Sequence, residues 1–136
     1  VTVVDAASPL AAEQIEEVER DLVLERDMAL LWSRTGTARN LLGLSQPWRE
    51  AHETSIERMA SLTALPEAPA GWLRDLAVLH TTYAQSLTRA NRTSEARAHL
   101  VSAHELIARQ LAISPADPRL LADKTELERM IAEAGQ

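Results

Sequence analysis

The segment from Arg74 to Ala103 constrains the fold more than any other part of the chain. Small and apolar residues return every three or four positions on both sides of Asn91, which is the spacing of two amphipathic helices with a break between them. The start of the segment is echoed 48 residues upstream, where Arg26-Asp27-Met28-Ala29-Leu30-Leu31 matches Arg74-Asp75-Leu76-Ala77-Val78-Leu79. Two similar helical hairpins in tandem indicate a repeated helical unit.

The composition supports an all-α fold in a single domain. The chain has 136 residues, only four Gly and no Phe, and it is rich in Ala and Leu. It has no Cys, which excludes a disulfide framework, a thiolate metal site and a thiol nucleophile. No apolar run approaches the roughly 20 residues that span a bilayer, and no signal peptide is visible. We therefore expect a cytoplasmic protein that does not bind membranes.

The net charge of −6 lies entirely in the first fifth of the chain. Residues 1–27 hold eight Asp or Glu and two Arg, whereas acidic and basic residues balance over residues 28–136. This acidic segment is either a solvated helix face, with acidic residues favoured near the helix N-terminus, or a docking strip for a basic partner. Because no stripe of basic residues is available to neutralise phosphates, a nucleic-acid partner is not expected.

The first helical hairpin is predicted over residues 9–64, after a tail or linker over residues 1–8. Ser8 is a suitable N-cap and Pro9 suits the first helical turn. The apolar period then continues to Leu41 or Leu42, which makes a helix of over 30 residues. Gly36 marks either a bend in this helix or a place where a neighbouring helix packs closely. Gly43 ends the helix, and a second one is expected from about Pro47 to about Ala64.

The second hairpin and a capping helix occupy the rest of the single domain, which we place over residues 9–136. Pro69 is expected to open a third helix, and Asn91, which tolerates a left-handed backbone, to end it. A fourth helix starts at Thr93 or Ser94, so that the second hairpin covers about residues 69–113. Asp117 is a good N-cap for a last helix over about residues 117–134. The prediction is all-α, with about five antiparallel helices.

The second hairpin resembles a tetratricopeptide repeat (TPR). The family's motif of large, small and turn residues is matched without gaps by His80, Tyr83-Ala84, Leu87, Asn91, Glu95-Ala96, Leu100 and Ala103. The first hairpin matches more loosely, at Trp32, Gly36, Gly43 and Glu50-Ala51. The segments Trp72–Val78 and Ser114–Pro118 resemble joints of long-helix bacterial TPR arrays, and the latter also those of kinesin light chains. The period of 48 exceeds the common period of about 34, because the helices are longer.

The resemblance implies stacked hairpins with a C-terminal capping helix and a partner-binding groove lined by the first helix of each hairpin. Carried over by spacing, the candidate groove residues are Ser33, Thr37 and Asn40 from the first hairpin and Val78, Thr81, Gln85, Thr88 and Arg89 from the second. Ser33 and Thr81 stand where carboxylate-clamping TPRs use Lys, so capture of a C-terminal carboxylate is not expected. A polar or extended peptide suits this lining better.

No catalytic, cofactor or metal site is predicted. None of the four His has a Glu three positions before it or a second His four positions after it, so two common helical metal motifs are missing. Glu95 and His99 share a helix face, which indicates a surface ion pair rather than a ligand set. Each Trp is expected to pack between helices, and Trp48, just after Pro47 at a helix start, is expected to be the least buried.

The expected function is a non-catalytic protein–protein interaction or scaffold module of a larger, bacterial protein, with a protein or peptide as partner and no cofactor. Two alternatives stay open. In the first, the short stack completes itself by forming a homodimer. In the second, the chain is a small helical ligand-binding or enzymatic domain, which would need a deep pocket with convergent His, Glu and Arg side chains.

Overall fold

The computed structural model describes the backbone of residues 3–135 and the side chains of residues 12–44 and 46–135. Over this range the chain forms five α-helices and no strand. They are α1 (Val3–Leu41), α2 (Ser45–Thr63), α3 (Trp72–Arg89), α4 (Thr93–Ile113) and α5 (Pro118–Ala134). The predicted all-α class with five antiparallel helices is therefore confirmed.

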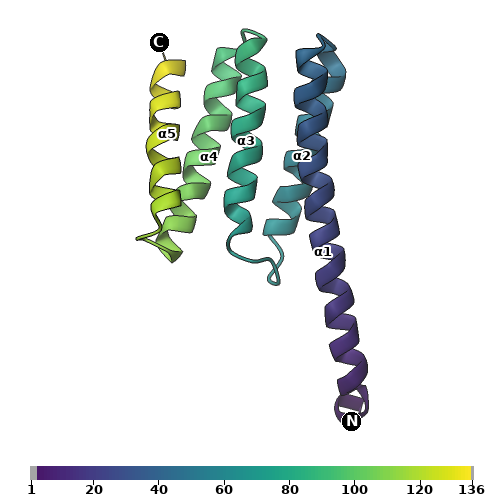
Figure 1. The fold of residues 1–136 in the computed structure, drawn as a ribbon. Coiled ribbons are helices and arrows are strands. Elements are labelled where there is room, and N and C mark those ends of the chain that lie inside the picture. The colour runs from purple at the N-terminus through teal and green to yellow at the C-terminus, as the bar shows by residue number, and fades with distance from the viewer. Residues whose placement is uncertain (1–2, 136) are drawn as a thin grey trace.

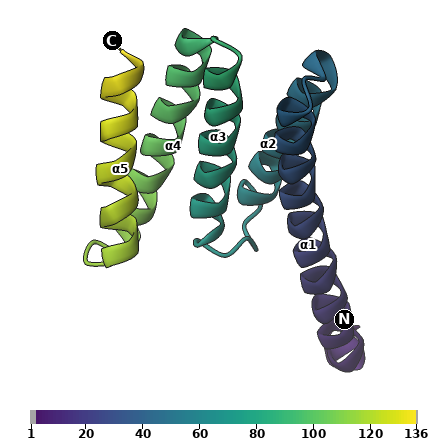
Figure 2. The same ribbon diagram turned by 45° about the horizontal axis from the view of Figure 1, so that its top comes forward.

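The helices are arranged as two hairpins and a last helix in a row. Figure 1 shows α1 and α2 at one side, α3 and α4 next to them, and α5 at the other side. The α1–α2 and α3–α4 turns lie at one end of the row, and the α2–α3 and α4–α5 loops lie at the other (Figures 1 and 2). Helix α3 packs on α1, α2 and α4, and α5 packs mainly on α4. The second half of α1 lies beside α2, and its first half projects beyond the α2–α3 loop.

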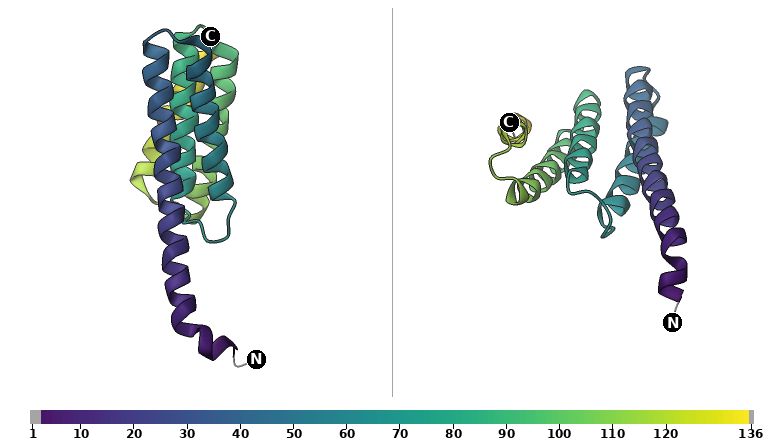
Figure 3. Two further views of the ribbon diagram at one scale, coloured as in Figure 1. Left: turned by 90° about the vertical axis from the view of Figure 1, so that its right-hand side faces the viewer. Right: turned by 60° about the horizontal axis from the view of Figure 1, so that its bottom comes forward.

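Helix α1 begins earlier than predicted. The tail over residues 1–8 and the helix start at Ser8-Pro9 are wrong for residues 3–8, which are helical, while residues 1–2 lie outside the described part. Ala6 and Ala7 have high helix propensity, and Asp5 lies near the helix N-terminus, where a carboxylate is favoured. Figure 3 shows the first turns bent away from the rest of α1, which is the effect expected of Pro9 inside a helix.

Gly36 is a close-packing position, which was one of the two predicted alternatives. Helix α1 continues through it without a break. A Cβ atom built on Gly36 would lie 2.7 Å from Cδ2 of His52 on α2. The glycine therefore lets the His52 ring lie directly against the α1 backbone.

The turns largely follow the predicted residues. Gly43 (φ 78°) and Asn91 (φ 61°) adopt left-handed conformations after α1 and α3. The Asp117 carboxylate accepts hydrogen bonds from the backbone N–H groups of Arg119 and Leu120, which confirms it as the N-cap of α5. The prediction that Pro69 opens α3 is wrong. Residues 69–71 form a turn instead, with carbonyls that accept i+3 hydrogen bonds from the first residues of α3.

The core runs between the helices along the row. Apolar side chains at helical spacing on α2, α3 and α4 are buried, including Met59, Leu76 and Ile107. Close contacts use alanines, and Ala84 and Ala96 are at most 1% exposed. The expectation for Trp48 is wrong: its side chain is 4% exposed, because its ring points toward α3 and packs edge-on against Tyr83 and His52.

Candidate functional site

Two depressions flank α3 and share its exposed residues. One lies between α3 and α5, and the other between α1 and α3. Val78, which is 40% exposed, and Thr82 line both. Helix α3 is thus a ridge that a bound segment could contact from either side.

The α3–α5 groove exists because α3 and α5 both pack on α4 and their backbones stay apart, joined by the side-chain contact between Arg74 and Asp123. Its deeper part has a volume of about 230 Å³, with Ile107 of α4 and Leu127 of α5 as its apolar floor. It continues past Gln85 and Met130 into a wider part of about 720 Å³ that reaches Thr93 at the start of α4. The result is an open groove along α4 with apolar side chains at its base.

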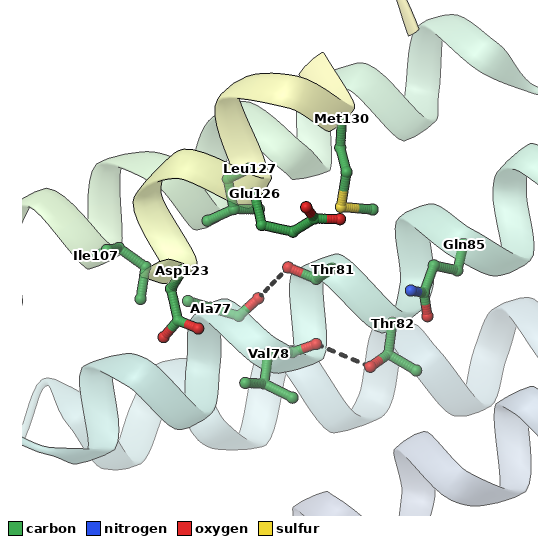
Figure 4. Close-up of a pocket in the computed structure, with 10 residues that line it drawn as sticks. All are labelled: Ala77, Val78, Thr81, Thr82, Gln85, Ile107, Asp123, Glu126, Leu127 and Met130. Carbon is green, nitrogen blue, oxygen red and sulfur yellow. Dashed lines mark hydrogen bonds between the residues drawn. The ribbon is translucent and has the colours of Figure 1, made fainter. Parts of the chain in front are cut away.

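The walls of the α3–α5 groove carry hydroxyl and carboxylate groups. Figure 4 shows Thr81 and Thr82 donating hydrogen bonds to the carbonyls of Ala77 and Val78 on their own helix. Their oxygen lone pairs remain able to accept hydrogen bonds. Asp123 and Glu126 project from α5 on the other side. This part of the groove can therefore accept hydrogen bonds and attract a positive charge.

Both carboxylates are already engaged by arginines. The Arg74 guanidinium donates two hydrogen bonds to Asp123, at 2.7 and 3.3 Å, and so ties α3 to α5. Glu126 accepts hydrogen bonds from Arg129, which holds the pKa of this carboxyl below its usual value. Glu126 stays ionised near neutral pH, and both carboxylates leave lone pairs for a ligand.

The α1–α3 depression has a volume of about 410 Å³ and a different charge. Leu30 and Leu41 of α1 and Leu79 of α3 make it apolar, and Ser33 and Thr37 add hydroxyl groups. Arg34 is its charged lining residue, and α1 has no acidic residue after Asp27 to neutralise it. The groove surface on the α1 side of α3 thus carries one basic residue, whereas the α5 side combines Asp123 and Glu126 in one part with Arg89, Arg129 and Glu133 in the other.

The predicted groove residues are divided between these depressions. Ser33 and Thr37 line the α1–α3 depression. Thr81, Gln85, Thr88 and Arg89 line the two parts of the α3–α5 groove. Asn40 lines neither, because its side chain accepts a hydrogen bond from Arg89 Nε at 2.7 Å and donates one to the Ser86 carbonyl at 3.4 Å. Their role in binding stays a prediction.

A polar layer lies where α2 meets α3, at the end of the row that holds Gly43. We call His52, Ser86, Tyr83, His99 and His80 the histidine layer. His52 and Ser86 are fully buried, and His52 Nε2 lies 2.9 Å from Ser86 Oγ. The Tyr83 ring stacks on His52, with centroids 5.0 Å apart, and contacts His99 on its other side at 4.6 Å. The layer thus joins α2, α3 and α4.

The remaining contacts of the layer are polar. His80 Nδ1 lies 2.9 Å from His99 Nδ1. The Tyr83 hydroxyl donates to Glu53 at 3.0 Å and accepts from Arg49 at 3.3 Å. Arg49 also binds Glu95 at 2.6 Å. The predicted Glu95–His99 ion pair is wrong, because Glu95 turns to Arg49 and Arg92 and His99 turns to His80.

Burial keeps these histidines neutral. Removal from water, together with the positive charges of Arg89 and His99, lowers the pKa of His52 to about 4. Removal from water and the neighbouring His99 lower the pKa of His80 to about 4, and burial also lowers the pKa of His99. The Nδ1 atom of His52 has no hydrogen-bond partner. The layer is therefore arranged for neutral rings.

Sequence reasoning did not identify the histidine layer or the carboxylate wall of the groove. His52 lies three positions from Ser55 and seven from Met59, on the predicted inner face of α2, and this spacing was the available signal. No spacing in the sequence predicted that Asp123 and Glu126 would line the groove, because their position depends on how α5 packs on α4.

The described part of the chain holds neither a metal-binding cluster nor a membrane-spanning helix. No group of three or more His, Asp or Glu side chains in the described part is placed to hold a metal ion. None of its helices combines the length and apolar character needed to cross a membrane. Comparisons with protein-family models, with curated proteins and with solved structures found no match.

Proposed function

We propose that this chain is a TPR-like, non-catalytic protein-interaction module of a larger bacterial protein, and that it acts in the cytoplasm. The observation that carries the proposal is the exposed ridge of α3 with a groove on each side, lined by side chains of α1, α3 and α5. Helices α1 and α3 are the first helices of the two hairpins, and the first helices line the binding groove in TPR proteins. The motif residues of the second hairpin support the same reading.

The lining indicates the kind of segment that would bind. Apolar side chains would be buried against Val78, Leu79 and Met130, and this burial would supply most of the affinity. Arg34 on the α1 side and Asp123 with Glu126 on the α5 side would orient the segment by charge. The ligand is thus a short protein segment with an apolar centre, an acidic residue toward α1 and a basic residue toward α5.

Site-specific photocrosslinking tests the location of binding. A photoreactive amino acid at Val78 would be compared with the same residue at Leu121, which is 45% exposed on α5 and lines neither groove. In lysate of the source organism, the Val78 variant is expected to yield a discrete crosslinked protein, and Arg34→Glu is expected to weaken its capture. Equal crosslinking from Leu121, or none from Val78, would count against the proposal.

Self-association is the second candidate, because α1 carries a row of exposed apolar side chains away from the grooves. Leu24, Met28 and Leu31 are 59%, 40% and 55% exposed and recur at helical spacing. A homodimer would bury this row against its symmetry mate. Light scattering across a concentration series decides: a dimer that Leu31→Asp converts to a monomer supports this candidate, and a wild-type monomer at high concentration contradicts it.

A further inference from the structure

The two hairpins meet in two chemically different zones. Near the α2–α3 loop the contact is apolar and buried, with Met59 and Leu62 of α2 facing the start of α3 at Leu73 and Leu76. Near Gly43 the contact is the histidine layer. Only the second zone contains buried groups whose charge changes between pH 7 and pH 4.

His52 is the central contact of the polar zone. Its ring lies against Gly36 of α1, its Nε2 atom meets Ser86 of α3, and its face stacks on Tyr83 of α3. A network of side chains surrounds this contact, because Ser86 Oγ also accepts a hydrogen bond from Arg89 Nη2 at 3.1 Å, and Arg89 holds Asn40 of α1. Three helices therefore converge on one buried imidazole.

This environment has no place for a protonated ring. The protonated ring carries a proton on both nitrogens, and the one on Nδ1 has no acceptor. The charged groups that face His52 are Arg89 of α3 and the titratable His99 of α4, and both disfavour a positive charge. The carboxylates of Glu53 on α2 and Glu95 on α4 are bound to Tyr83 and Arg49, and Gly36 and Asn40 of α1 are neutral.

We propose that neutral His52 is an acid-sensitive latch, which holds the Gly43 end of the first hairpin on the second and releases it when the ring is protonated. The apolar zone near the α2–α3 loop remains packed and serves as the hinge. The His80–His99 contact lies within the second hairpin and does not join it to the first, although a 2.9 Å separation of two Nδ1 atoms also requires that one of them lacks a proton. Release separates α1 from α3 and changes the α1–α3 depression between Ser33 and Val78. The inference rests on the proposed function, since it assigns a regulation to one of its two grooves.

Distance measurements between spin labels test the latch directly. The chain has no Cys, so Leu42→Cys and Ala90→Cys place labels at exposed positions beside the Gly43 and Asn91 turns. Between pH 7.5 and pH 4 the distance is expected to lengthen while circular dichroism shows that the helices persist. A control pair within the second hairpin, Ala90→Cys with Glu105→Cys, should keep its distance.

A variant that cannot be protonated supplies the decisive comparison. His52→Phe keeps a ring against Gly36 and Tyr83, and it is expected to keep the 42–90 distance short to a pH at least one unit lower than wild type. If this variant does not fold, the NMR titration of His52 in the wild-type protein replaces it, and its midpoint should coincide with the change in distance.

Three results would overturn the latch: a constant distance down to pH 4, a change that coincides with loss of helicity, or the same opening in folded His52→Phe. In the NMR experiment, a His52 titration separate from the distance change would do so as well. No ligand takes part in these readouts, so a failure of the groove to bind protein segments would leave their outcome unaffected.

Discussion

Gly36 shows how one residue determines the packing of a whole hairpin. Its missing side chain lets α1 approach the His52 ring, which then reaches Ser86 and Tyr83 of α3. A bulkier residue at position 36 would push His52 away from these partners. The sequence pointed to this position through the glycine itself, but the identity of its neighbour depended on the pairing of α1 with α2.

Gly36→Ala is expected to destabilise the protein by about 1–3 kcal/mol, because the added Cβ would lie 2.7 Å from a ring that is fixed on its other sides. The free energy of unfolding from urea denaturation measures the effect. Gly71→Ala is the matched control: nothing lies within 4 Å of its added Cβ and its φ is −60°, so this change should be neutral or slightly stabilising. Equal stabilities of the two variants would contradict the close contact.

Asn91 occupies a backbone conformation that most side chains avoid. Its φ of 61° lets the chain turn from α3 into α4. Asn91→Ala is expected to cost about 1 kcal/mol, whereas Asn91→Gly should be neutral or stabilising. Thermal unfolding of both variants under one buffer condition checks the order, and a more stable alanine variant would contradict the left-handed turn.

At the scale of elements, the α3–α4 hairpin follows its sequence most closely. The small residues of the motif, Ala84 and Ala96, are 1% and 0% exposed where the two helices approach. Their period and the turn at Asn91 were sufficient to predict this hairpin. The start of α1 was not predictable in the same way, because Ser8-Pro9 has the local chemistry of a helix start and yet lies inside a longer helix.

Ala84→Leu and Ala96→Leu are each expected to destabilise by about 1–3 kcal/mol, since three extra carbons cannot fit between the helices. Ala98→Leu places the same change on the exposed side of α4 and should alter stability by less than about 0.5 kcal/mol. Urea titrations of the three variants suffice. If both buried substitutions changed the free energy of unfolding as little as Ala98→Leu, Ala84 and Ala96 would not lie at close contacts between α3 and α4.

The candidate grooves could be predicted only in part. The resemblance to TPR proteins placed Thr81, Gln85 and Val78 among the groove residues of α3, which is a property of one helix. The division into two grooves depends on the angle at which α5 packs on α4 and on the separation of the α3 and α5 backbones. Such relations between helices are set by side-chain packing over many residues and have no signature in a single segment.

At the scale of the whole molecule, the buried histidines make stability depend on pH. The pKa of folded His52 is lowered to about 4, below the ordinary value of 6.5. The unfolded chain therefore binds more protons below pH 6.5, and the stabilisation that is complete above this pH is lost as the pH falls toward 4. For one histidine the loss is up to about 1.4 kcal/mol per pH unit.

Urea denaturation at pH 7, 6 and 5 is expected to show a falling free energy of unfolding. The range above pH 5 is chosen because Glu95, whose pKa is lowered mainly by Arg92, stays ionised there and contributes little to the slope. In His52→Phe, the free energy of unfolding should change less with pH than it does in the wild-type protein. A stability that is constant between pH 7 and pH 5 would be incompatible with neutral, buried imidazoles.

The unequal lengths of α1 and α2 give the hairpin interface a mechanical consequence. Helix α1 has 39 residues and α2 has 19, so α1 extends about 30 Å farther, past the loop that joins α2 to α3. Along α1, the histidine layer lies on one side of this loop and the projecting first half of the helix lies on the other. A tilt of about 10° moves the tip of this projecting half by about 5 Å. If the first hairpin tilts about this loop, the acidic end of α1 moves opposite to its Gly43 end and by a similar distance, because the two parts of α1 are of similar length.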